Sequence, residues 1–138
     1  MKYNIVQKAL ETFVKTNWTT TAIQYDNIAF NSDIYTQYIS CNIVFGEGVS
    51  RTITRGCYRQ FGLLIITVYT KSSTGSNNRL TLAAAIVTML THKEVQPVTP
   101  DTSPIVSLKV PSLHSDNSEK SGWVRTQVSC PFYYDLEL

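Results

Sequence analysis

Hydrophobic and polar positions repeat with two different periods along this chain. In residues 4–15 the apolar residues recur at helical spacing and share one stripe, formed by Ile5, Val6, Ala9, Leu10, Phe13 and Val14. Such a stripe predicts an amphipathic helix whose apolar side packs against another element, most simply a sheet. A second helix is predicted over about 78–91 from a stripe of the same kind, formed by Ala83, Ile86, Val87 and Leu90.

Period-two patterns predict strands elsewhere in the chain. Residues 34–45 alternate between apolar and polar side chains, which is typical of a half-buried strand. In residues 57–71 both parities are apolar around "FGLLIITVY", so this strand is predicted to be central and buried on both faces. Shorter patterns predict an edge strand within 17–31 and a strand over 105–110. The aromatic stretch "GWVRTQVSCPFYYD" (122–135) predicts the last strand.

Turn-forming residues separate these elements. The stretch "GEGVSRTITRG" (46–56) predicts either a flexible loop or an extended β-arm. Residues 71–78 and 92–104 read as irregular connections, and 111–121 as a polar hairpin loop. The order of helix, strands, helix and strands predicts a single α+β domain over residues 1–138. Its sheet should be mostly antiparallel or mixed, with two α-helices packed on one face.

Composition narrows the class of partner. Charged residues make up only 16% of the chain, and the formal net charge is +2. The small net charge argues against nucleic acid or an anionic membrane as the main partner. The low charged fraction indicates both a surface rich in Ser, Thr and Asn and a surface hidden against other proteins. No signal peptide and no apolar run near the ~20 residues of a membrane helix is recognisable, so we expect a soluble protein with no membrane partner.

Catalytic chemistry finds little support in the sequence. A nucleophilic site needs a thiol or hydroxyl beside a general base, and His92 and His114 are the only histidines. The three cysteines, Cys41, Cys57 and Cys130, are widely spaced, and an odd count argues against a disulfide framework. Reduced, packed thiols fit better than metal ligands. We therefore expect no enzyme activity, no metal and no cofactor.

One basic and aromatic stretch leaves two interpretations open. Arg51, Arg55 and Arg59 lie close to Tyr58 and Phe61. Such interleaving is found in proteins that bind single-stranded nucleic acid. Arginine and aromatic residues are also enriched at protein–protein interfaces, and the second interpretation, an interface arm, is favoured.

Several stretches together resemble the tail terminator-like proteins of long-tailed bacteriophages. The start "ALETFVKTNW" followed by "AIQYDNIAF" is similar to the family's opening helix, Trp and β-prone run. "RGCYRQFGLLIITVYTKSSTG" is similar to its Gly/Arg stretch and the long strand that follows, and "LTLAAAIVTML" to its Ala-rich helix. "GWVRTQVSCPFYYD" is similar to its closing strand. The chain departs from the family in its Thr run, Thr19–Thr21, and in the Pro/Thr stretch at 96–104.

The resemblance implies a structural protein of the virion, assembled in the host cytoplasm. Such proteins form a ring, usually of six copies, on the head-proximal end of the tail tube. The ring stops tube growth and offers a surface to the head–tail connector, and DNA only passes through its lumen. Another neck or head-completion protein, or a tail-tube-like protein, is the alternative, and a small nucleic-acid-binding domain is less favoured. We expect the subunit contacts to involve Glu47, Arg51, Arg55, Arg59, Trp123, Arg125, Tyr133 and Tyr134.

Overall fold

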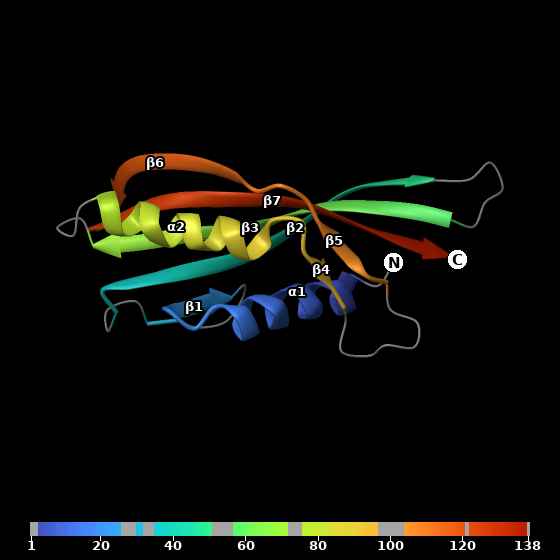
Figure 1. The fold of residues 1–138 in the computed structure, drawn as a ribbon, viewed down its shortest axis with the longest axis horizontal. Helices are drawn as coiled ribbons and strands as arrows, with labels where there is room; N and C mark the ends of the chain where they lie inside the picture. Colours follow the sequence, from blue (N-terminus) through green and yellow to red (C-terminus); the bar gives the residue numbers. More distant parts are fainter. Residues whose placement is uncertain are drawn as a thin grey trace.

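The computed structural model describes residues 3–25, 30–31, 35–50, 57–71, 76–96, 104–120 and 122–137. The described part of the chain forms two helices and a seven-stranded sheet (Figure 1). In chain order, the elements are α1 (Tyr3–Asn17), β1 (Ala22–Tyr25), β2 (Gln37–Ser50), β3 (Cys57–Lys71), α2 (Ser76–Leu90), β4 (Glu94–Val95), β5 (Val106–Leu108), β6 (Ser112–Lys120) and β7 (Trp123–Glu137). The predicted α+β class is confirmed.

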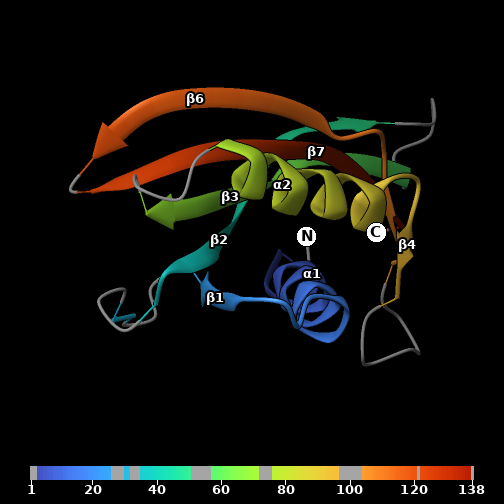
Figure 2. The ribbon, with the colours of Figure 1, turned by 60° about the vertical axis from the view of Figure 1, so that its left-hand side comes forward.

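The sheet is mixed and has the strand order β1-β2-β3-β7-β5-β4, with β6 also paired to β7. Only β1 and β2 run parallel; the other described pairs are antiparallel. Strands β5 and β6 share one edge of β7, because β5 pairs with 132–133 and β6 with 123–129. Figure 2 shows β6 running along β7. The edge strand predicted within 17–31 is β1.

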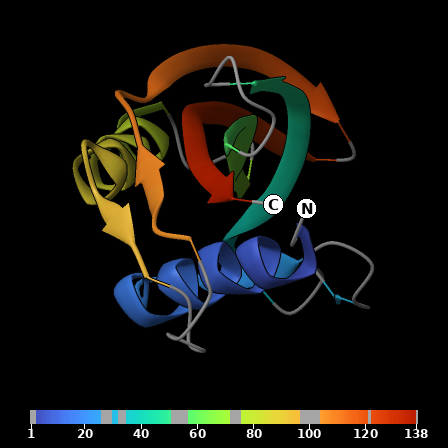
Figure 3. The ribbon, with the colours of Figure 1, turned by 90° about the vertical axis from the view of Figure 1, so that its right-hand side faces the viewer.

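Both helices cover the same face of the sheet, as predicted. A single core cluster contains buried residues of α1, such as Leu10, and of α2, such as Ile86, together with strand residues such as Ile66 and Val128. Seen end-on, the sheet is strongly curled (Figure 3). The far ends of β2, β3 and β7 extend past both helices (Figure 1).

Strand β3 is central, because β2 and β7 pair with it on either side. The prediction that it is buried on both faces fails at Leu63. Leu64 and Ile66 point into the core and are fully buried, whereas Leu63 on the opposite face is 38% exposed. Its cross-strand neighbour Val44 is 51% exposed. We call this side, away from the helices, the outer face.

Two predicted loops contain strand. Within 46–56, residues 46–50 continue β2 past an irregularity between Phe45 and Gly48, which supports the β-arm interpretation there; residues 51–56 lie outside the described residues. The polar loop predicted over 111–121 is wrong, because β6 fills most of it. An edge strand gains its backbone hydrogen bonds from one neighbour and needs no apolar pattern. The polar sequence of this segment therefore did not indicate a strand. The chain then turns at Gly122, whose φ of 82° favours glycine.

Smaller differences concern the segment between α2 and β6. Strand β5 is shorter than the strand predicted over 105–110. The irregular connection predicted at 92–104 contains the two-residue strand β4, and residues 97–103 lie outside the described residues.

The glycine at position 62 makes room for an aromatic contact. Gly62 pairs with Phe45 on β2 and Phe132 on β7, and the two phenyl rings meet edge to face at 6.1 Å between centroids. A Cβ at position 62 would collide with the Phe132 ring and lie 2.8 Å from the carbonyl oxygen of Val44. Phe132 is fully buried, so its ring has little room to move away.

We expect Gly62→Ala to lower the free energy of unfolding by about 1–3 kcal/mol through overpacking. The matched control is Gly46→Ala, whose added Cβ would lie 3.5 Å from the Phe61 carbonyl oxygen, an ordinary contact. That control should change stability by about 0.5 kcal/mol or less. Urea denaturation of both variants measures the difference, and equal stabilities would contradict the packing argument.

Candidate functional site

The outer face carries exposed apolar side chains in register. Val44, Leu63 and Pro131 are cross-strand neighbours on β2, β3 and β7, and the first two are exposed. Further along β2, Val49 is 43% exposed and lies opposite Arg59. We call Val44, Val49 and Leu63 the outer strip. Neighbouring exposed apolar side chains on a sheet mark an interaction surface better than scattered ones do.

An ion pair lies beside the outer strip. The Arg59 guanidinium donates to both oxygens of Asp135, from Nε at 2.8 Å and from Nη2 at 3.1 Å. It also lies 4.2 Å from the centroid of the Tyr133 ring. The hydrogen bond to Asp135 is the main cause that raises the pKa of Arg59. Two predicted contact residues, Arg59 and Tyr133, are thus brought together, and the charge of Arg59 is balanced within its own chain.

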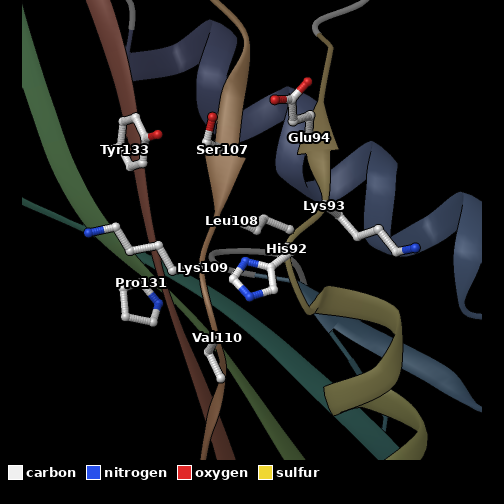
Figure 4. Close-up of a pocket in the computed structure, with 9 residues that line it drawn as sticks. All are labelled: His92, Lys93, Glu94, Ser107, Leu108, Lys109, Val110, Pro131 and Tyr133. Carbon is white, nitrogen blue, oxygen red and sulfur yellow. The ribbon is translucent and has the colours of Figure 1, made fainter.

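A groove of about 600 Å³ adjoins Tyr133 on the other side of β7 (Figure 4). Its lining residues come from the segment after α2, from β4, from β5 and the two residues after it, and from β7; they are His92, Lys93, Glu94, Ser107, Leu108, Lys109, Val110, Pro131 and Tyr133. Sequence reasoning missed this groove, because it depends on the pairing of β5 with two residues of β7.

Backbone hydrogen bonds hold the walls of the groove together. The Leu108 N–H donates to the Lys93 carbonyl at 2.8 Å, and the Lys109 N–H donates to the Pro131 carbonyl at 2.9 Å. His92 has a φ of 51°, a left-handed conformation that ends α2 and turns the chain toward β4. The Lys109 ammonium lies 5.4 Å from the Tyr133 ring centroid and 5.7 Å from that of Phe61.

Aromatic rings gather at the opposite end of the sheet. Tyr38 stacks on Tyr69 at 4.7 Å between centroids and meets Trp123 edge to face at 5.0 Å. Phe30 packs against Tyr38 at 4.9 Å. The Lys71 ammonium lies 4.4 Å from the centroid of one of the Trp123 rings. Trp123 therefore makes its observed contacts within its own chain and is only half-buried there.

The remaining predicted contact residues lie in different surroundings. Glu47 is exposed on β2, and Arg125 is exposed on β7. Tyr134 is fully buried in the core, where burial raises its pKa to about 12, so it has no exposed area to offer a neighbour. Arg51 and Arg55 lie outside the described residues.

The thiols and imidazoles differ in burial. Cys41 and Cys130 are buried, and burial raises the pKa of the Cys130 thiol to about 11. Its Sγ lies 3.4 Å from the Lys109 carbonyl oxygen, to which it donates. His92 and His114 are exposed.

Among the described residues, no cluster of three or more His, Cys, Asp or Glu side chains can hold a metal ion. None of the described helices is long and apolar enough to cross a membrane.

These features define an α+β domain built on one long curled sheet, with apolar surface left open on the sheet's outer face. The chain belongs to the phage tail terminator protein family, whose family model matches residues 4–132. It is thus a structural protein of phage tails. The comparison with curated proteins finds no match.

Solved structures share this fold. One covers 97% of this chain and 96% of its own, with a TM-score of 0.71 and 15% identity. Another, from the virion of a native gene transfer agent particle, covers 99% of both chains, with a TM-score of 0.59 and 14% identity. At such identities the likeness establishes the fold alone.

Thiol burial predicts selective alkylation. In the native protein at about pH 8, iodoacetamide should modify Cys57, which is half-buried, and spare Cys41 and Cys130, because only an accessible thiolate reacts. Peptide mass spectrometry locates the modified residue, and the same reaction in denaturant should label all three. Native labelling of Cys130 as fast as Cys57 would contradict the described core.

The same burial predicts a loss of stability in alkali. Between the ordinary thiol pKa near 9 and the folded value of about 11, Cys130 keeps its proton in the native state and loses it in the unfolded state. The native state then binds more protons, so the free energy of unfolding falls as pH rises through this window. Chemical denaturation at a series of pH values measures the slope. Cys130→Ala should make the slope shallower between about pH 9 and pH 11, and an unchanged slope in that variant would refute the assignment.

Proposed function

We propose that this protein is a tail terminator that forms a ring, of six copies, on the head-proximal end of the tail tube. The ring stops the addition of tube protein and presents a joining surface to the head–tail connector. DNA passes through its lumen, and the protein is assembled in the host cytoplasm and stays in the virion. The observation that carries this proposal is the family match over residues 4–132, which includes both helices and most of the sheet.

The open outer strip supports the assembly part of the proposal. Val44, Val49 and Leu63 are each exposed by more than a third of their surface. Leaving them in water is unfavourable by roughly 25 cal/mol for each Å² of apolar area. Covering them with a protein neighbour removes that cost, and a head-to-tail contact repeated by rotation closes into a ring.

The nucleic-acid interpretation loses part of its support. Arg59 is held by Asp135 in a two-point ion pair, so its charge is already balanced within the chain. The alternative of a neck or tail-tube-like role is kept as an outcome of the test, because a fold likeness to a chain of a virion does not by itself assign a position in a particle.

The test is removal of the gene from the phage, followed by electron microscopy of the particles. We expect tails of excess length without heads, because nothing stops tube growth or joins the capsid. Supplying the wild-type chain in trans should restore normal particles. Particles without any tubes would indicate a tube role, and tubes of normal length that lack heads a connector role. Normal tails joined to capsids would contradict the whole proposal.

A further inference from the structure

One edge of the sheet is open along the outer half of β2. Strand β1 pairs only with residues 38–41 of β2, and beyond them the same side of β2 meets no strand in the part of the chain that is described. We call residues 42–50 the β2 edge. It exposes Val44, Glu47 and Val49. The irregularity between Phe45 and Gly48 interrupts the ladder with β3 next to Glu47.

The groove lies toward the other edge of the same half of the sheet. The strand order there is β2-β3-β7-β5-β4, so β3 and β7 separate the β2 edge from β5 and β4. Figure 3 shows β2 on one side of the molecule and β4 with β5 on the other. A contact between these two surfaces can therefore form only between different copies.

The charges in the groove are unevenly balanced. Lys109 extends over β7, away from Lys93 and Glu94 (Figure 4), and forms no ion pair with any described carboxylate. Val110, which is 55% exposed, and the half-buried Pro131 give the groove an apolar wall. It therefore suits a segment that combines apolar side chains with a negative charge.

The β2 edge has this chemistry. Its two exposed valines match the apolar wall, and Glu47 has no cationic partner among the described residues. The interrupted ladder at residues 45–48 disfavours simple strand-to-strand addition, because bulges disrupt the pattern that another strand would need. A contact through side chains in a groove is compatible with it.

We propose that the β2 edge of one copy sits in the groove of the next copy, with Glu47 facing Lys109. This inference rests on the proposed function, since it identifies the two surfaces that build the ring. Because the two surfaces differ and lie toward opposite edges of one sheet, each copy offers one to each neighbour. Such a heterologous contact closes into a ring when its rotation permits.

Charge exchange tests this contact. Glu47→Lys and Lys109→Glu should each weaken self-association at least about tenfold, because like charges then face each other. The double variant should recover most of the lost association. Sedimentation velocity of the full chain gives the oligomer mass, expected at about six times 15.5 kDa for the wild type. Lys15→Glu makes the same charge change at an exposed position of α1. It is the matched control and should leave association unchanged.

Two further readouts keep the outcomes separate. Circular dichroism checks that each variant folds, and complementation of the gene deletion shows whether tail length follows the same order of variants. Unchanged oligomers in both single variants, or a double variant that fails to recover, would overturn the contact and leave the terminator proposal intact. A Lys109→Glu chain that forms normal rings but does not restore tail length would also overturn the contact and leave the terminator proposal intact, because the groove would then bind another protein. A wild-type chain that neither assembles nor limits tail length would overturn both proposals.

Discussion

The structure depends on the register of β3 between β2 and β7. Each of these strands has 14 or 15 residues, and the pairing extends over nearly their full length. A slip of one residue would turn Leu64 and Ile66 out of the core and bring Leu63 in. Gly62 restricts such a slip, because only a residue without a side chain fits between Val44 and Phe132. The helices, the core and the composition of the outer face all follow from this register.

The low charged fraction of the sequence has a structural counterpart. The central strands place apolar residues on both faces, yet the two helices cover only one of them. Some of the aromatic side chains pack against one another within the chain, as Tyr38, Tyr69 and Trp123 do. The exposed apolar side chains of the outer strip lie on the outer half of the sheet, beside the Arg59–Asp135 pair and the groove. A partly apolar surface of this kind suits protein partners better than nucleic acid.

The sequence was sufficient for the elements with strong periodicity. Both helices and the long strands β2, β3 and β7 were predicted from the spacing of apolar residues, and the edge strand β1 from β-prone residues beside a turn. Strand β6 was missed because its stability comes from backbone pairing with β7, which leaves no apolar signature. The inner position of Tyr134 beside the outer position of Tyr133 follows from strand parity, but two adjacent tyrosines look alike until the register is known. The groove could not be predicted, since it is produced by segments that meet only after folding.

The pairing of β3 with β7 also affects how the chain folds during its synthesis. Strand β7 follows β3 in the chain only after α2, β4, β5 and β6, so β3 leaves the ribosome well before β7 does. Until β7 is synthesised, one edge of β3 lacks its strand partner. The backbone beside Leu64 and Ile66 is unpaired on that edge during this time. If the chain were released before β7 is made, the unpaired apolar strand β3 would be exposed to other nascent chains. The interval between the emergence of these two strands is therefore the part of synthesis in which the chain is most prone to aggregation.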